Sequence, residues 1–145
     1  MPEVARVLRE SFAEFEHLYT RGGYAATTPD APELRERWPQ GPVWVVERDG
    51  AIVGSVAAVA KDGGVYVRSM AVSPASRGTG AARDLMRQLE LFAVGERATR
   101  LFLSTTPFLF DAIRLYEALG FRRTGGPPHD LAGTPLFTME KELDR

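Results

Sequence analysis

Apolar side chains at the start of the chain recur at the spacing of a helix. Five of them fall on one face, with glutamates between them: Val4, Leu8, Phe12, Phe15 and Tyr19. This pattern predicts an amphipathic helix. Arg21-Gly22-Gly23 is expected to end it.

A second, shorter helix is predicted to begin near Asp30. Pro32 suits its first turn, and Glu33 stands three residues after the cap. Between the two helices, residues 22–29 are expected to form a flexible stretch that shapes a binding cleft.

The centre of the chain changes to the pattern of strands. Strands are predicted over residues 43–46, 51–60 and 65–72, with Asp49-Gly50 and residues 61–64 as the turns between them. Short connections of this kind join antiparallel neighbours. Three antiparallel strands in sequence are therefore expected.

The rest of the chain alternates helices and strands. One helix carries Ala82, Leu85, Met86, Leu89 and Ala93 on a common face, and another is marked by Phe108, Ala112, Leu115 and Leu119 and stopped by Gly120. Strands are predicted over residues 101–104 and 136–141, the last after a Gly/Pro-rich loop over residues 125–133. The expected fold is a single α/β (α+β) domain over residues 1–145, with a mixed, mostly antiparallel sheet flanked by about four helices.

Composition narrows the function. The 145 residues are 44% hydrophobic and 26% charged, and 18 basic against 19 acidic side chains give a net charge of −1, which argues against nucleic-acid binding. The absence of cysteine excludes disulfides and thiolate chemistry, and two histidines make a metal site improbable. Neither a signal peptide nor a transmembrane run is recognisable, so the expectation is a cytoplasmic protein without a membrane partner.

The segment over residues 70–82 carries the clearest chemical signal. The strand predicted over residues 65–72 is followed by a loop, and two glycines lie where the next helix is predicted to begin. Helix N-termini expose unpaired N–H groups and attract anions. Gly78 and Gly80 let the backbone approach a bulky phosphate, and Arg77 adds a cation at the rim. A phosphate-binding loop is therefore predicted.

Three kinds of phosphate loop come into question. A nucleotide P-loop requires a lysine that is absent here, and a Rossmann turn requires a third glycine where Arg83 stands. The segment resembles the pyrophosphate loop of the GNAT superfamily of acetyltransferases, [QR]-x-x-G-x-[GA]. Arg77, Gly80 and Ala82 occupy its defined positions. A glycine-rich helix start without a ligand is the alternative for this hexapeptide alone.

A second signature follows at the expected distance. Residues 112–121 read AIRLYEALGF and resemble the superfamily pattern A-[IV]-x-L-Y-x-x-x-G-F. Core packing would explain the apolar positions and Tyr116 by themselves. Two motifs in the right order, each on its predicted element, favour the family interpretation over residues 43–143.

The resemblance implies a reaction and a set of site residues. An amine would attack the thioester carbonyl of acetyl-CoA, the cosubstrate, within a ternary complex and without a metal. Tyr116 would give a proton to the departing thiolate, and the backbone of Met70, Ala71 and Val72 would bind the pantetheine arm like an extra strand, with the Val72 amide or a neighbour facing the thioester oxygen. The pyrophosphate would be held by Arg77, Gly78, Thr79, Gly80, Ala81 and Ala82.

Three departures from the family pattern bear on the site. Leu109 replaces an asparagine that often contacts the cofactor, and Tyr66 stands where members often place a glutamate base. Deprotonation would then use ordered water, a residue from elsewhere such as the His129-Asp130 pair, or an acceptor that arrives neutral. The family also opens with a strand, for which residues 1–3 leave no room.

The acceptor and the class of function stay open at this point. A non-catalytic acyl-CoA-binding regulatory module and, less favoured, a nucleotide-binding domain are the alternatives. In the family the first two helices and the loop before the last strand line the acceptor site. A small-molecule or peptide amine is expected there, drawn by acidic residues of that region (Glu14, Glu16, Asp30 and Glu33) if they are more than a solvated surface. A homodimer is a further expectation from the resemblance.

Overall fold

The computed structural model describes residues 2–127 and 129–143. Helical elements come first: α1 (Pro2–Phe12), the 3-10 helix η1 (Ala13–Leu18), α2 (Arg21–Thr27), α3 (Ala31–Arg37) and the 3-10 helix η2 (Trp38–Gln40). Strands β1 (Val43–Arg48), β2 (Ala51–Lys61) and β3 (Gly64–Val72) follow. The remainder comprises η3 (Pro74–Ser76), α4 (Ala81–Gly95), β4 (Arg100–Thr105), α5 (Phe110–Ala118), β5 (Arg122–Arg123), β6 (His129–Leu131) and β7 (Thr134–Glu142).

The strands form one mixed sheet. Their order is β1-β2-β3-β4-β7-β5, with β6 paired to β7 beside this path. Only β3 and β4 pair in parallel; the other pairs are antiparallel. The predicted mixed, mostly antiparallel sheet is therefore confirmed.

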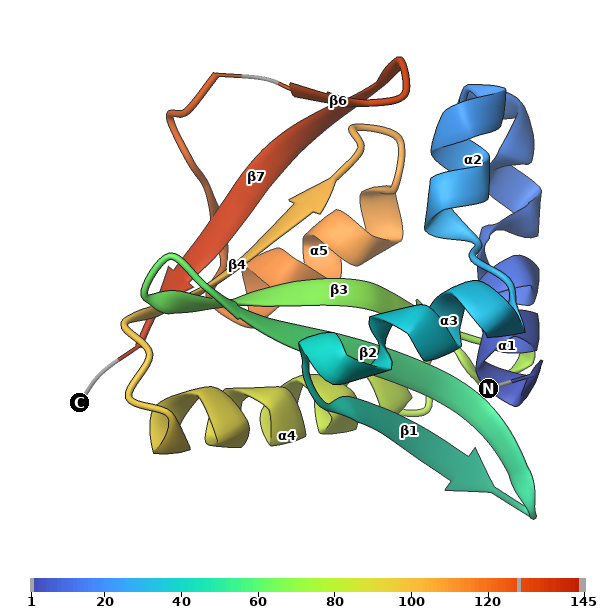
Figure 1. The fold of residues 1–145 in the computed structure, drawn as a ribbon, viewed down its shortest axis with the longest axis horizontal. Helices are drawn as coiled ribbons and strands as arrows, with labels where there is room; N and C mark the ends of the chain where they lie inside the picture. Colours follow the sequence, from blue (N-terminus) through green and yellow to red (C-terminus); the bar gives the residue numbers. More distant parts are fainter. Residues whose placement is uncertain (1, 128, 144–145) are drawn as a thin grey trace.

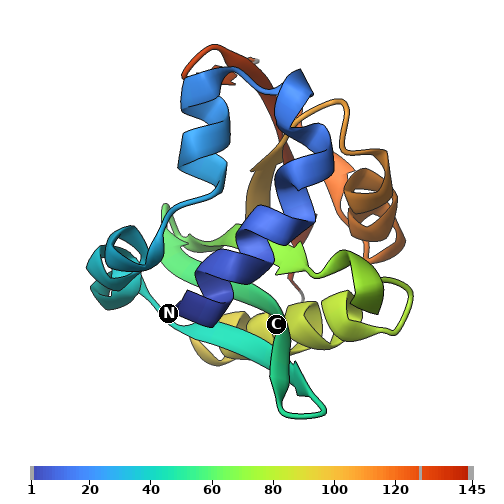
Figure 2. The same ribbon diagram turned by 90° about the vertical axis from the view of Figure 1, so that its right-hand side faces the viewer.

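Helices cover both faces of this sheet (Figures 1 and 2). On one face, α4 and α5 pack on the strands around a large apolar cluster that includes Leu85, Leu89 and Leu101. On the other face, α1 and α3 form a smaller cluster in which Val7 and Leu8 are fully buried and Ala71 is the contribution of β3. Strand β3 therefore lies between the two layers and contributes to both.

Strands β3 and β4 separate soon after they meet. Their parallel pairing is confined to Val65 with Leu101 and Tyr66 with Phe102, although both strands continue. Opposite β2, the register of β3 shifts by one residue after Arg68, and Ser69 takes a φ of 57°. Such a bulge bends a strand and increases its twist. The β4-facing edge of β3 is thus left without a strand partner over its last residues.

The stretch expected to be flexible is instead helix α2. Thr20 caps it by accepting a hydrogen bond from the Gly23 N–H at 3.0 Å. The two glycines do not end a helix; they allow close packing, because a Cβ on Gly23 would lie 2.2 Å from Thr134 Oγ1 and one on Gly22 would lie 2.8 Å from the Ala132 Cβ. The prediction was wrong because the partner surface is more than 100 residues away in the sequence.

Other expectations from the sequence need smaller corrections. The described residues form five α-helices where about four were expected, since α2 is additional. The loop predicted over residues 125–133 contains β6, which pairs with β7. On α4, Ala81 rather than Ala82 joins the buried face. Helix α1 begins at Pro2, the first residue that the structure describes.

Candidate active site

A cavity of about 440 Å³ opens where β3, α4, α5 and the first helix meet. It has the size of a small-molecule binding site. All but one of the predicted site residues line it: Met70, Ala71, Val72, Arg77, Gly78, Gly80, Ala81, Ala82 and Tyr116. Two motifs about 30 residues apart in the sequence are therefore brought to one cavity.

The exception is Thr79. Its hydroxyl donates a hydrogen bond to the Ser76 carbonyl at 2.5 Å, within the turn that leads to α4. Its side chain thus holds the shape of the loop, and it is not among the residues that line the cavity.

The N-terminus of α4 is built to leave its N–H groups available. Gly80 precedes the helix with a φ of 86°, and no side chain caps it. Gly78 also takes a positive φ, of 79°, which a residue with a side chain adopts only under strain. The 15-residue helix directs its uncapped amides and the positive end of its dipole at the cavity, as an anion site requires.

Arg77, predicted as a cation at the rim, lines the cavity and is held there by contacts of its side chain. Its Nη1 is paired with the Glu14 carboxylate, and its Nη2 donates to the Ser11 carbonyl at 2.9 Å. In this structure the guanidinium fastens the loop to the end of α1 and to η1. Sequence analysis missed this contact because nothing in the local pattern links Glu14 to a residue 63 positions later.

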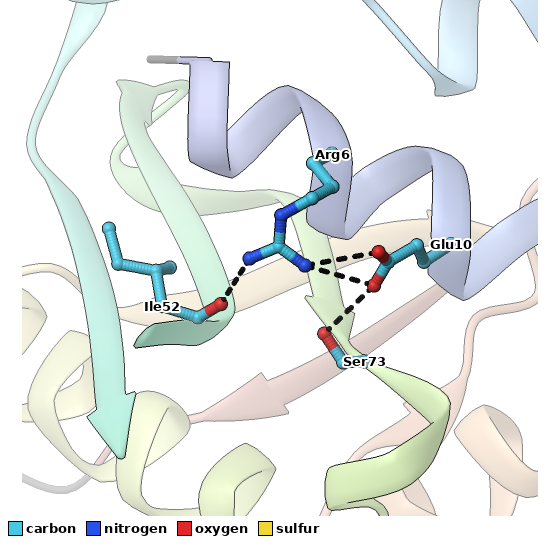
Figure 3. Close-up of polar contacts among 4 residues, drawn as sticks. All are labelled: Arg6, Glu10, Ile52 and Ser73. Atoms are coloured by element: carbon cyan, nitrogen blue, oxygen red, sulfur yellow. Dashed lines mark hydrogen bonds and ion pairs between the residues drawn. The ribbon is translucent and has the colours of Figure 1, made fainter. Parts of the chain in front are cut away.

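A second polar cluster fastens the start of the same loop to α1 (Figure 3). Arg6 reaches both Glu10 carboxylate oxygens at 3.1 Å and the Ile52 carbonyl at 2.9 Å, and the Ser73 hydroxyl lies 3.5 Å from Glu10 Oε2. Because Ser73 comes directly after β3, α1 holds the segment from β3 to α4 near both of its ends.

The wall formed by α1 and η1 was also missed. Ser11, Phe12 and Phe15 line the cavity. The two aromatic residues belong to the predicted apolar face, but the pattern could not show that this face extends beyond the core. A predicted helix face indicates burial and does not say what is buried against it.

Tyr116 lies on α5, lines the cavity and is 7% exposed. Burial raises the pKa of its phenol well above the ordinary value, and the neighbouring Tyr19 and Tyr66 raise it further. The group is therefore a neutral hydrogen-bond donor across the physiological range. Burial also raises the pKa of Tyr19 to about 12, against hydroxyl contacts from Thr27 and Thr106 that lower it.

The structure shows where the residues that depart from the family pattern lie and what they contact. Leu109 lines the cavity, so an apolar side chain stands where an amide would contact a cofactor. The Tyr66 ring packs against the Phe102 ring at a tilt of 49°, with ring centroids 5.3 Å apart. His129 Nε2 lies 3.1 Å from Ser104 Oγ, whereas Asp130 accepts a hydrogen bond from the Gly133 N–H at 2.8 Å. The aspartate serves the β6–β7 turn and does not orient the imidazole.

Three of the four acids expected to attract a cationic amine are already engaged. Glu14 pairs with Arg77. Asp30 and Glu33 form a reciprocal capping box at the start of α3. A negative acceptor site made of these side chains finds no support in their contacts.

Fold and cavity together are those of a coenzyme A-dependent acyltransferase. The sequence profile of the acetyltransferase (GNAT) family matches residues 7–121. The chain belongs to this family, and it is an acyltransferase that uses acetyl-CoA as its cosubstrate.

Individual relatives agree with this assignment. The uncharacterised N-acetyltransferase YjgM of Escherichia coli (strain K12) is 36% identical over 126 residues, which cover 83% of this chain and 75% of YjgM. The N-acetylaspartate synthetase of Homo sapiens is 40% identical over 101 residues, covering 68% of this chain but only 33% of that enzyme. A GNAT family acetyltransferase from Elizabethkingia anophelis with acetyl-CoA bound shares the fold, with a TM-score of 0.65 and 19% identity over 79% of this chain and 84% of that one.

Two features are absent from the described part of the chain. No group of three or more histidine, aspartate or glutamate side chains there is arranged to hold a metal ion. None of its helices is long and apolar enough to cross a membrane.

Proposed function

We propose that the chain transfers the acetyl group of acetyl-CoA to a primary amine by direct attack within a ternary complex, with Tyr116 as general acid. The observation that carries this proposal is the convergence, in one cavity, of an uncapped helix N-terminus, an unpaired strand edge and a buried phenol. Each of the three suits a different part of acetyl-CoA: the pyrophosphate, the pantetheine arm and the sulfur of the thioester.

The loop from Arg77 to Ala82 binds the pyrophosphate. Its main-chain N–H groups and the dipole of α4 supply the attraction, since the Arg77 side chain is engaged with Glu14 and Ser11. Arg77 acts mainly by holding the loop in shape. Positive φ values at Gly78 and Gly80 orient the amides.

The pantetheine arm runs along β3 between the two separated strands. The β4-facing edge of Met70, Ala71 and Val72 has no strand partner in the structure, so its N–H and C=O groups are free to pair with the amides of the arm. An amide in this stretch, at Val72 or beside it, donates to the oxyanion that forms when the amine attacks the carbonyl carbon.

The phenol of Tyr116 donates to the sulfur as the C–S bond breaks. Its raised pKa keeps the proton on the oxygen until negative charge builds on the departing thiolate. The same shift makes a free phenolate costly, so the transfer occurs late, as the thiolate departs. The amine loses its proton to ordered water or to His129, because no acid stands on β3.

The acceptor is a small molecule or a peptide amine. The human relative is named for an N-acetylated amino acid, so free amino acids belong beside peptides and polyamines among the amines to test. A homodimer is also proposed from the family resemblance.

The test is release of coenzyme A thiol from acetyl-CoA across such a panel of amines. We expect release to depend on an added amine and on Tyr116. Cofactor binding without release for any amine would contradict transfer and favour the non-catalytic acyl-CoA-binding module.

A further inference from the structure

Arg83 is a cation of the large cavity that no acid neutralises. Three of the residues that line this cavity carry charge: Arg77, Arg83 and Asp111. Arg77 is paired with Glu14. The Arg83 side chain is exposed and takes part in no ion pair or hydrogen bond within the part of the chain that the structure describes. Its guanidinium is therefore available to a ligand.

The position of Arg83 on α4 is unfavourable for a cation in the free protein. Helix α4 begins at Ala81, so Arg83 lies in its first turn, where the positive end of the helix dipole opposes a positive side chain. Arg87 follows four residues later, and like charges at this spacing repel each other. Asp84, the acid of the first turn, lies 3.9 Å from Arg48 through Oδ2 and Nη2. A bound anion beside Arg83 would relieve this repulsion.

Arg83 lies next to the loop that is proposed to hold the pyrophosphate. This loop covers residues 77–82, and Arg83 is the residue that follows it. The Cα atom of Arg83 lies about 4.5 Å along the helix axis from that of Gly80. Side chains of a helix lean toward its N-terminus. The guanidinium is therefore close to the phosphate end of the ligand.

The exposure of Arg83 selects one group of the coenzyme. The sulfur end is proposed to meet Tyr116, which is 7% exposed, so the opposite end of the molecule lies toward the open side of the cavity. That opposite end is the adenosine, whose ribose carries a third phosphate, a monoester on the 3′ oxygen. An exposed cation at the cavity and a phosphate at the outer end of the ligand are thus complementary.

We propose that Arg83 binds the 3′-phosphate of coenzyme A, so that the protein prefers coenzyme A to dephospho-coenzyme A. This inference rests on the proposed position of the pyrophosphate. A phosphate monoester carries nearly two negative charges at neutral pH, and a guanidinium donates two parallel hydrogen bonds to its oxygens. Because Arg83 is exposed, the attraction is screened by salt.

The test compares coenzyme A with dephospho-coenzyme A, which lacks only this phosphate. Isothermal titration gives the affinity of each ligand for the full chain as the wild type, Arg83→Gln and Arg83→Lys. Arg87→Gln is the matched control, because it removes the same charge from an exposed position one turn along α4 that does not line the cavity. No turnover is involved, so the result depends neither on the acceptor nor on the general acid.

The wild type should bind coenzyme A about fivefold more tightly than dephospho-coenzyme A, as a solvent-exposed charge contact allows. Arg83→Gln should lose this preference by binding coenzyme A more weakly and dephospho-coenzyme A equally well. Arg83→Lys should keep part of it, since the ammonium group is still a cation. The control should keep the preference of the wild type. Added salt should reduce the preference of the wild type and leave Arg83→Gln unchanged.

The melting temperature without ligand separates binding from a structural role. Arg83→Gln should melt at the temperature of the wild type or slightly above it, because the repulsion from the helix dipole and from Arg87 is removed. A lower melting temperature with an equal loss of affinity for both ligands would assign Arg83 to the loop structure and overturn the proposal. Equal losses at an unchanged melting temperature would place Arg83 on the pyrophosphate and overturn it as well.

Failure of this proposal is distinguishable from failure of the proposed function. If the wild type binds both ligands with the same affinity, the assignment of Arg83 is wrong, whereas the cofactor cavity and the transfer reaction stand. If neither ligand binds, the cavity itself is misassigned and both proposals fall. If the preference depends on Arg83 but no amine is acetylated, the phosphate contact stands and the transfer reaction falls.

Discussion

The two layers of the molecule are assembled in different ways. On the side of α4 and α5, the wall of the cavity comes from two short segments of the chain, residues 70–83 and 109–116. On the side of α1 to α3, contacts join residues more than 100 positions apart, such as the Thr20 hydroxyl with the Ala132 carbonyl at 2.7 Å. The side of α4 and α5 is therefore determined by short segments, whereas the side of α1 to α3 depends on packing between segments that are distant in the sequence.

The largest expected effect is on the catalytic rate and concerns Tyr116 in the cavity. Tyr116→Phe should lower kcat by about 10²-fold, a typical contribution of a general acid, with little change in the affinity for acetyl-CoA. Because burial raises the pKa of Tyr116, the phenol stays protonated as pH rises, and wild-type activity should not fall between pH 8 and ~10, the ordinary pKa of tyrosine. Steady-state rates across this range provide the measurement. Tyr24→Phe, outside the cavity, is the control, and equal rates for the wild type and Tyr116→Phe would remove Tyr116 from the mechanism.

The next effect is on stability and lies on the side of α1 to α3. Gly23→Ala would place its Cβ 2.2 Å from Thr134 Oγ1, and overpacking of this kind costs about 1–3 kcal/mol. Gly95→Ala meets nothing within 4 Å and should leave stability unchanged or slightly raised. Denaturant unfolding of both variants measures the difference. Equal midpoints would show that α2 does not dock on β7 as described.

A smaller effect tests the helix start. Gly80→Ala introduces a side chain at a φ of 86°, and Gly50→Ala does the same at 79° in the β1–β2 turn. Both should lose about 1–2 kcal/mol of stability through the same backbone strain. Only Gly80→Ala should also weaken coenzyme A binding, by about tenfold, or 1.4 kcal/mol. Calorimetric titration of both variants with coenzyme A is the measurement. An equal loss of affinity in the two variants would contradict a role of the loop in binding.

These comparisons show which parts of the structure could be predicted from the sequence. Strands β1, β2, β3, β4 and β7, helices α4 and α5, and the segment that lines the cavity between Met70 and Ala82 were predictable, because each depends on period, glycine placement or a short motif. The short strands β5 and β6 were not predicted. Helix α2 was not, since Gly22 and Gly23 resemble a helix stop until Thr134 is placed beside them. The bulge at Ser69 was not predictable either, because no glycine marks its positive φ.

The smallest effect concerns the contact that joins the two layers. Glu14→Gln removes the charge partner of Arg77, and exposed ion pairs of this kind contribute about 0.2–1 kcal/mol. Affinity for coenzyme A should change less than threefold, because the Ser11 carbonyl still holds the guanidinium. Thermal unfolding and titration measure the two quantities. A tenfold change in affinity would assign Arg77 a direct part in binding the phosphate.

The most direct test is isothermal titration of the folded protein with coenzyme A. The main-chain donors at the start of α4 should produce saturable binding at one site per chain, in the micromolar range, and the Gly80→Ala substitution should weaken it. No heat of binding at millimolar coenzyme A would contradict the assignment of this cavity and everything derived from it.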